Sequence, residues 1–337
     1  MDTSREGLNK KKTIKIGVWG CESAGKTTLM AVMALISWTH FHSIGFLLRA
    51  LRPLIKFFLK VQPFKGSLKY MNQWQIRPLR SHDKSREFFE IIIKIFKQKR
   101  IFLGATPVKF DATDHIAYEF HSLTTDQTFE ANFLDLSGEF FKGCNFRNQQ
   151  KETNIGGDVN GSAVVDGVFD YLNQCNGLLC LVDINSSEML FSSLFNTLYE
   201  LVGRSRTRLI EKPIIFCISK ADTAKHISEK IYTFDDLVKK QEIRDLFLHP
   251  NGPFMDEALG MIETYCNTDL VRFAFISSIG VLKNGNKKVP NIMRDQRGRF
   301  RRIDPKSKGV KLLRINVLEV FDTIFRLCKE KDKVDAL

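Results

Sequence analysis

The chain has 337 residues, enough for one large domain or two small ones, and its apolar fraction of 43% is that of a globular protein with a core. Seven cysteines stand singly, without a Cys-x-x-Cys pair, which excludes a zinc knuckle and a disulfide framework and fits a reducing cytoplasm. The net charge of +13 is unevenly distributed. Residues 44–100 hold 14 Lys/Arg against 3 Asp/Glu, and residues 283–311 hold 11 against 2, so we expect a mildly acidic body with two basic insertions.

These charge blocks suggest a simple domain organisation. We expect a flexible amino-terminal segment over 1–12, one domain over 13–330 and a tail over 331–337. Residues 1–12 lack the apolar core of a secretory signal, so we expect no signal peptide there. Two insertions interrupt the domain. The first, 44–105, is predicted to be helical, basic and amphipathic, and the second, 283–309, to be a basic loop.

A glycine-rich loop joins the first predicted strand, 13–19, to the first predicted helix, 26–43. The loop fits the pattern G-x-x-x-x-G-K-[ST] in the strand-loop-helix context that this motif requires. Its glycines let backbone N–H groups curl around phosphate oxygens, Lys26 can reach the β- and γ-phosphates, and Thr27 can offer its hydroxyl to Mg²⁺. The candidate phosphate-binding residues are Gly20, Glu22, Ser23, Ala24, Gly25, Lys26, Thr27 and Thr28.

The first insertion opens with a basic amphipathic segment, 44–61. Its basic residues are spaced three or four apart and share one narrow face of a helix, while Phe and Leu cover the rest. Such a helix either binds a membrane surface or a partner, or docks on the body of the protein with a basic outer stripe. A second helix is predicted over 85–98. We find no transmembrane segment.

Two strands, 115–121 and 128–134, form a predicted antiparallel hairpin. The second strand ends at Asp135, where an aspartate can hold Mg²⁺, usually through water. Gly138 can present its N–H to the γ-phosphate. A simple Asp-Gly turn is the alternative interpretation of this element.

The remainder of the chain alternates between apolar strands and helices. Strands that are apolar on both faces and alternate with helices indicate a mostly parallel sheet with helices on both sides. We therefore predict an α/β fold of three layers, with one antiparallel edge strand contributed by the hairpin. The predicted strands are 177–184, 213–219 and 271–277, and the predicted helices are 161–174, 187–203, 234–248, 255–266 and 310–329.

Polar residues follow two of these strands, at the sheet edge where ligands of such folds bind. Asp222, in Ser219-Lys220-Ala221-Asp222, can accept two N–H groups from guanine, for which adenine has no matching donors. Lys220 can lay its aliphatic stem along the purine ring. In Ser277-Ser278-Ile279 the loop backbone would contact the base oxygen.

A threonine that meets the γ-phosphate and Mg²⁺ is expected before the second strand of the sheet. Thr106 is our first choice, and Thr113 is the second. Both are loop threonines, which are common in proteins of any class.

This set of motifs in this order resembles the Ras-like P-loop GTPases of the translation-factor class. The Asp-Leu-Ser-Gly-Glu segment, 135–139, and the insertion after the first helix look most like the bacterial double-GTPase proteins of conflict and defence systems. The resemblance implies a P-loop NTPase fold and Mg²⁺-dependent hydrolysis of GTP, with Lys26, Thr106 and Glu139 as catalytic residues and Thr27, Asp135 and Thr106 around the metal. It further implies a nucleotide-gated switch that acts on an effector or activating protein, one candidate being a second GTPase.

Two residues depart from the family pattern. Ser219 stands where the guanine motif usually begins with Asn, so nucleotide affinity is expected to be reduced. Glu139 stands where Ras-like proteins carry the Gln that orients water, so intrinsic hydrolysis is expected to be slow and to need an arginine. Arg147, Arg77 and Arg80 could supply it in cis, or a partner could supply it in trans.

Three alternatives stay open. The chain could be a GTP-binding scaffold with little hydrolysis, or an ATPase if Asp222 is not at the base. It could also bind a membrane surface or nucleic acid, with the nucleotide secondary. The Phe- and Leu-rich segment 44–61 suits lipid, whereas 283–311, with many arginines and few apolar residues, suits nucleic acid. We expect a cytoplasmic protein, with peripheral contact at the inner membrane surface through 44–61 as an open alternative.

Overall fold

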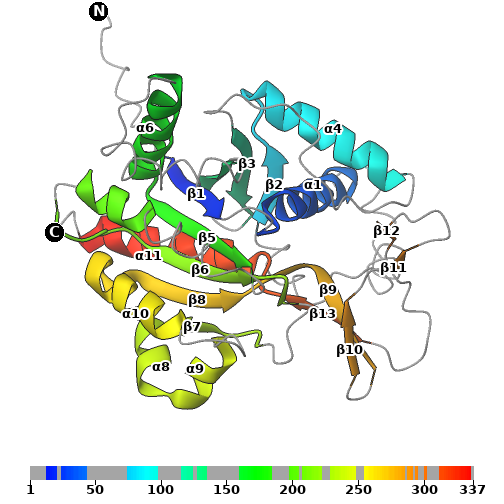
Figure 1. Cartoon of the computed structure of the whole chain (residues 1–337). Coiled ribbons are helices and arrows are strands. Elements are labelled where there is room, and N and C mark those ends of the chain that lie inside the picture. The colour runs from blue at the N-terminus through cyan, green and yellow to red at the C-terminus, as the bar shows by residue number, and fades with distance from the viewer. Residues whose placement is uncertain are drawn as a thin grey trace, which may run out of the picture.

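The structure is a computed structural model, and Figure 1 shows its architecture. It describes residues 13–20, 24–43, 74–97, 115–123, 127–134, 159–183, 197–204, 207–221, 228–247, 254–284, 287–290, 293–294, 300–301 and 311–334.

The centre of the protein is an eight-stranded sheet with the order β2-β3-β4-β1-β5-β6-β8-β7. The five strands β4, β1, β5, β6 and β8 are parallel, and β3 pairs antiparallel with β4 as the predicted hairpin. Two strands that were not predicted extend the edges: β2 pairs antiparallel with β3, and β7 with β8. The strands are β1 (Ile14–Gly20), β2 (Trp74–Pro78), β3 (His115–Ser122), β4 (Thr128–Leu134), β5 (Gly177–Asp183), β6 (Ile214–Ser219), β7 (Ile231–Thr233) and β8 (Val271–Phe275).

Helices cover both faces of this sheet, because its strands present apolar side chains alternately to either side. In β1, Val18 belongs to one buried cluster and the next residue, Trp19, to another. The predicted α/β fold, mostly parallel and three layers thick, is confirmed. The helices are α1 (Lys26–Ser43), α4 (Asp83–Lys97), α6 (Val159–Gln174), α8 (Phe234–Lys239), α9 (Gln241–Phe247), α10 (Phe254–Tyr265), the short η3 (Thr268–Leu270) and α11 (Glu319–Val334), and residues 197–203 are also helical.

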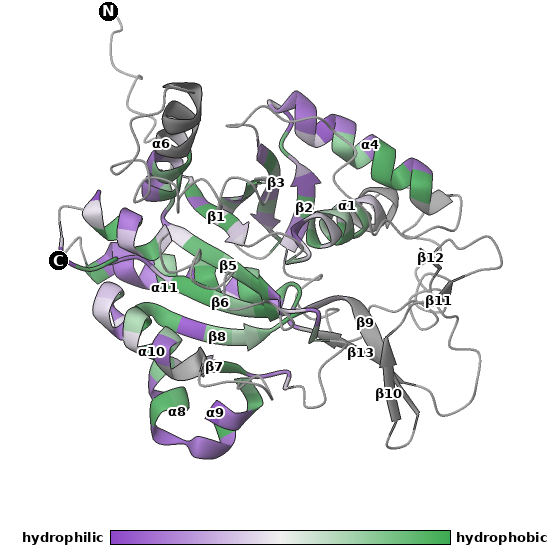
Figure 2. Cartoon of the chain, viewed as in Figure 1, coloured by the Kyte–Doolittle hydropathy of each residue, from purple (hydrophilic) through white to green (hydrophobic). Residues whose placement is uncertain are grey.

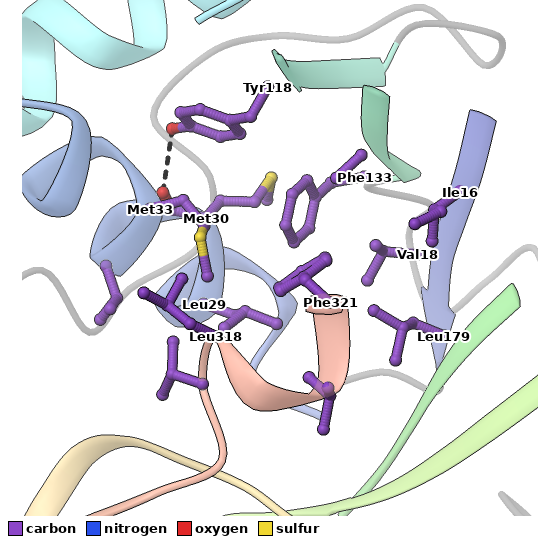
Figure 3. Packing of buried hydrophobic residues seen from close by; sticks show 14 of the residues in the cluster. Ile16, Val18, Leu29, Met30, Met33, Tyr118, Phe133, Leu179, Leu318 and Phe321 are labelled. Carbon is purple, nitrogen blue, oxygen red and sulfur yellow. Dashed lines mark hydrogen bonds between the residues drawn. The ribbon is translucent and has the colours of Figure 1, made fainter. Parts of the chain in front are cut away.

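The first cluster lies between the sheet and helices α1, α4 and α11. Figure 3 shows its centre, where Phe133 of β4 and Phe321 of α11 meet side chains of α1. Tyr118 of β3 is fully buried, and its hydroxyl donates a hydrogen bond of 2.9 Å to the carbonyl of Met30. A buried hydroxyl without a partner would cost free energy, so this bond fixes α1 against the hairpin.

The second cluster lies on the opposite face, beneath α6, α8, α9, α10 and the helical residues 197–203. All seven residues of β5 are buried, as a central strand covered on both sides requires. Figure 2 shows β5, β6 and β8 as largely apolar. Lys212 caps the carboxyl end of α6. Its ammonium donates hydrogen bonds to the carbonyls of Leu172, Asn173 and Cys175 at 2.8–3.1 Å.

The second insertion differs from the predicted loop, since its described residues form strands. β9 (Ser277–Asn284) pairs antiparallel with β10 (Lys287–Pro290) and with β13 (Lys311–Ile315), and the short strands β11 (Met293–Arg294) and β12 (Phe300–Arg301) pair with each other. Ile315 lies opposite Ser277, so the segment 277–315, which contains the insertion, ends beside the point where it begins. In Figure 1 the three-stranded sheet continues beyond β8, away from the central sheet.

The helix predicted over 310–329 is wrong in its first part. Residues 311–315 are strand β13, and the helix begins at Glu319. Asn316 separates the two elements: its φ is 50°, in the left-handed region that asparagine tolerates better than most residues. Its buried side chain donates a hydrogen bond of 3.0 Å to the carbonyl of Phe275, the last residue of β8.

The described part of the first insertion consists of β2 and α4. Trp74 is buried with its ring against Phe129 and Phe325, and its indole N–H donates to Asp322 of α11 at 3.0 Å. The amphipathic segment 44–61 lies outside the described residues. None of the helices within the described ranges combines the length and apolar character that a bilayer crossing requires.

Candidate functional site

The parallel strands bring three of the predicted polar segments to one edge of the sheet. Gly20 at the end of β1 lies opposite Leu181 of β5, and Asp183 at the end of β5 lies opposite Ser219 of β6. Since neighbouring strands lie about 4.8 Å apart, the ends of β1 and β6 are roughly 10 Å from each other. Ligands of α/β sheets bind outside this carboxyl edge.

The loop from β1 to α1 has the backbone features of a phosphate loop. Gly25 has a φ of 80°, a conformation that side-chain-bearing residues rarely adopt. A side chain at Gly20 would come within 2.3 Å of the carbonyl oxygen of Leu181, so β1 and β5 can lie this close only with glycine there. Ala24 is buried at the start of the helix, and Cys21, Glu22 and Ser23 lie outside the described residues.

Lys26 begins α1 and is held beneath this loop. Its side chain is 5% exposed, and its ammonium donates a hydrogen bond of 2.7 Å to the carbonyl of Gly20. Burying an ammonium is costly unless polar groups compensate it, so the position requires a functional or structural reason. The contact holds the ammonium of Lys26 beside Gly20 and the amino-terminal end of α1, where the positive charge and the helix dipole would both stabilise an anion.

Thr27 and Thr28 follow in the first turn of α1 and are both partly exposed. A threonine hydroxyl suits Mg²⁺, which takes one or two protein oxygens and completes its shell with water and phosphate oxygens. Asp135 and Thr106, the other predicted metal ligands, lie outside the described residues. The described ranges contain no group of three His, Cys, Asp or Glu that could hold a metal ion.

The end of β6 holds the predicted base motif. The Ser219 hydroxyl donates to the carbonyl of Val182 in β5 at 3.1 Å, so this donor is directed to the neighbouring strand. Lys220 has a φ of 54°, which is strained for a residue with a side chain, and such strain often accompanies functional sites. Asp222, the residue expected to bind guanine, lies outside the described residues.

Asp183 is a further candidate site residue, which the sequence patterns did not single out. Its carboxylate is 9% exposed and lies 2.5 Å from the ammonium of Lys220, the residue expected to lie along the base. The sequence signal was an acidic residue at the end of an apolar strand, the same signal that identified Asp135. It was overlooked because Asp183 was included in the apolar run of the strand.

The third predicted segment begins a strand instead of a loop. Ser277, Ser278 and Ile279 are the first residues of β9, and Ser277 is buried. Ile276, just before them, donates its N–H to the carbonyl of Ile218 at 2.8 Å and accepts from the N–H of Ala221 at 3.3 Å. These two bonds join the ends of β6 and β8, so the two predicted base-binding segments are adjacent.

Several predicted residues cannot be placed. Thr106, Thr113, Gly138, Glu139 and Arg147 lie outside the described residues. Of the other two arginines proposed to assist hydrolysis, Arg77 forms an ion pair with Glu119 across β2 and β3, and Arg80 is exposed in the turn before α4.

Comparison with known proteins leaves the family open. No model of a known protein family matches the chain, and no curated protein matches it either. Among solved structures, the crystal structure of a mutation variant of SsGBP is similar over 79% of this chain, with 12% identity and a TM-score of 0.26. The match covers 50% of that chain, so the present chain spans about half its length. A TM-score of this size carries no weight, and the fold described above rests on its own strand order.

Proposed function

We propose that the protein binds GTP with Mg²⁺ at the carboxyl edge of the central sheet and hydrolyses it to GDP slowly, as a nucleotide-gated switch for a partner protein. The observation that carries the proposal is the loop from Gly20 to Lys26. Three features support it: the left-handed Gly25, the buried Lys26 ammonium on the Gly20 carbonyl and the start of α1, all of which suit a bound phosphate.

Each group at this edge has a proposed role. Lys26 would exchange its contact with Gly20 for the β- and γ-phosphate oxygens, and Thr27 would hold Mg²⁺ together with Asp135 and Thr106. The metal, when bound, neutralises charge on the phosphates. Glu139 would accept a proton from the attacking water, and without a hydrogen-bond donor at this position hydrolysis is expected to be slow.

The strand order supports the choice of a nucleotide over another anion. In the spatial order β3-β4-β1-β5-β6-β8, the glycine-rich loop follows β1. The ends of β6 and β8 therefore lie on one side of this loop, at the same edge of the sheet. Lys220 is partly exposed there, and the buried hydrogen bond from Ala221 to Ile276 holds the ends of β6 and β8 together. A base would lie there, and Asp222 would make the site prefer guanine.

Binding of a fluorescent GTP analogue in the presence of Mg²⁺ tests the proposal. Lys26→Ala should weaken binding at least 100-fold, whereas Lys230→Ala, at an exposed lysine before β7, should change it less than twofold. GTP should displace the analogue at least 100-fold better than ATP does. Unchanged binding by Lys26→Ala would refute the phosphate site, and equal displacement by ATP would refute the guanine preference.

Hydrolysis is measured separately, in single turnover with excess protein. We expect a slow release of phosphate that EDTA abolishes. Stimulation by a cell extract would indicate an activating partner, and binding without any phosphate release would make the protein a scaffold.

A further inference from the structure

The three-stranded sheet of β9, β10 and β13 carries charge of one sign. Its described residues, with those of β11 and β12, include seven basic residues and no acidic one. The basic residues are Lys283, Lys287, Lys288, Arg294, Arg301, Lys311 and Arg314. This concentration goes beyond what nucleotide binding at the central sheet requires.

The strand register aligns three of these lysines. Lys288 of β10 lies opposite Lys283 of β9, and Lys283 lies opposite Lys311 of β13. Residues opposite each other in an antiparallel sheet share a face, so one row across the sheet is lysine in all three strands.

The next row on the same face is apolar. Two residues along each strand from the lysines, Pro290 lies opposite Val281 and Val281 lies opposite Leu313. The rows are about 7 Å apart, and each is about 10 Å long across three strands. A basic row beside an apolar row matches a ligand that has a line of negative charges on one side and flat apolar groups on the other.

We propose that this sheet binds single-stranded nucleic acid, with phosphates along Lys288, Lys283 and Lys311 and bases toward the apolar row. A single strand exposes both its backbone and its bases, whereas a duplex hides the bases. A membrane is less suited to this face, because surface-binding segments rely on a much wider apolar side. The proposal is independent of GTP binding.

The test uses the full-length chain and a fluorescein-labelled oligo(dT) of 20 nucleotides, titrated at several KCl concentrations. The three lysines are changed together to glutamine (Lys283→Gln, Lys288→Gln and Lys311→Gln). Each phosphate contact in a single strand contributes about 0.7 to the slope of log K against log salt, so the slope should fall by about 2. At 0.1 M salt this corresponds to about 100-fold weaker binding.

A matched control removes the same charge elsewhere. Lys94→Gln, Lys230→Gln and Lys333→Gln, at exposed positions in α4, before β7 and in α11, should change affinity less than threefold. A variant with arginine at the three sheet positions should keep the wild-type slope. The melting temperature of the glutamine variant is measured alongside, to show that the variant is folded. If the triple glutamine variant does not fold, Lys283→Gln alone should lower the slope by about 0.7.

Several results would overturn the proposal. The first is that the wild type does not bind the oligonucleotide at 0.1 M KCl. The second is that the glutamine and control variants lose affinity equally, and the third is that the wild type binds a duplex of the same length with equal affinity. Equal competition by polyglutamate or by vesicles rich in phosphatidylserine, at matched charge concentration, would show a general polyanion surface instead of one for nucleic acid.

Discussion

Gly20→Ala is the sharpest test of the strand packing beneath the phosphate loop. A Cβ at this position would come within 2.3 Å of the Leu181 carbonyl oxygen and 2.9 Å of the Leu181 Cβ. Both contacts are shorter than 3.0 Å, which real Cβ atoms essentially never show, and the first is with backbone. A side chain could turn away, but here β1 and β5 would have to separate. Overpacking typically costs 1–3 kcal/mol, and we expect the upper end, about 3 kcal/mol.

Thermal unfolding without nucleotide measures this cost apart from any effect on binding. A loss of about 3 kcal/mol should lower the melting temperature by roughly 4 °C in a protein of 337 residues. Gly260→Ala is the matched control, because Gly260 is an exposed residue inside α10 with no atom within 4 Å of the added Cβ. It should be neutral or stabilising by up to about 1 kcal/mol. If Gly20→Ala melts within 1 °C of the wild type, the close approach of β1 and β5 is wrong.

Three further predictions concern groups that the structure pairs. Asp183→Asn and Lys220→Met should each weaken binding of the GTP analogue several-fold. The double variant should be no weaker than the worse single variant, because the two residues form one ion pair, which the proposed function places beside the base. Lys212→Met should lower stability by about 2 kcal/mol in urea unfolding, since three carbonyls at the end of α6 lose their donor. Hydrogen bonds from Lys240 and then from Thr233 lower the pKa of Asp236 to about 2, so its stabilisation is complete above about pH 4 and is lost as the pH falls toward 2. Asp236→Asn should remove this contribution from urea midpoints measured between pH 5 and 2.

Each of these predictions has a clear contrary result. Additive losses in the double variant of Asp183 and Lys220 would mean that the two residues act independently. Lys212→Met with wild-type stability would mean that water can replace the ammonium at the end of α6. Parallel pH profiles for the wild type and Asp236→Asn would show that the capping box of α8, which Thr233 and Asp236 form, has little effect on stability.

The first strand and helix could be predicted from the sequence nearly to the residue. The phosphate-loop pattern fixes where a strand must end and a helix begin, and α1 covers the predicted range 26–43. The five parallel strands were predicted for a similar reason, because runs such as Ile214–Ser219 are apolar on both faces and short. These elements depend on local patterns.

The elements that were missed depend on distant residues. β2 is a strand because Trp74 packs on Phe129 and Phe325, which the sequence around it does not reveal. β13 was included in the following helix because its apolar residues continue the helical pattern, and only pairing with β9 and the left-handed Asn316 separate the two. The ion pair of Asp183 with Lys220 was missed for the same reason, since its members are 37 residues apart.

The pairing of Ser277 with Ile315 brings together the two ends of residues 277–315, the segment that contains the second insertion. The chain leaves and re-enters the main domain at almost one point, and Asn316 ties the return to the end of β8. The distance that must be bridged between β8 and α11 is therefore the same whatever lies between. Because doubling the length of a closed loop costs only about 0.6 kcal/mol, residues 285–310, between β9 and β13, can change in length at little cost, whereas β9 itself contacts α1. Changes confined to the part of this segment beyond β9 would leave Ser277, Ser278 and Ile279, the candidate base-binding residues, in place.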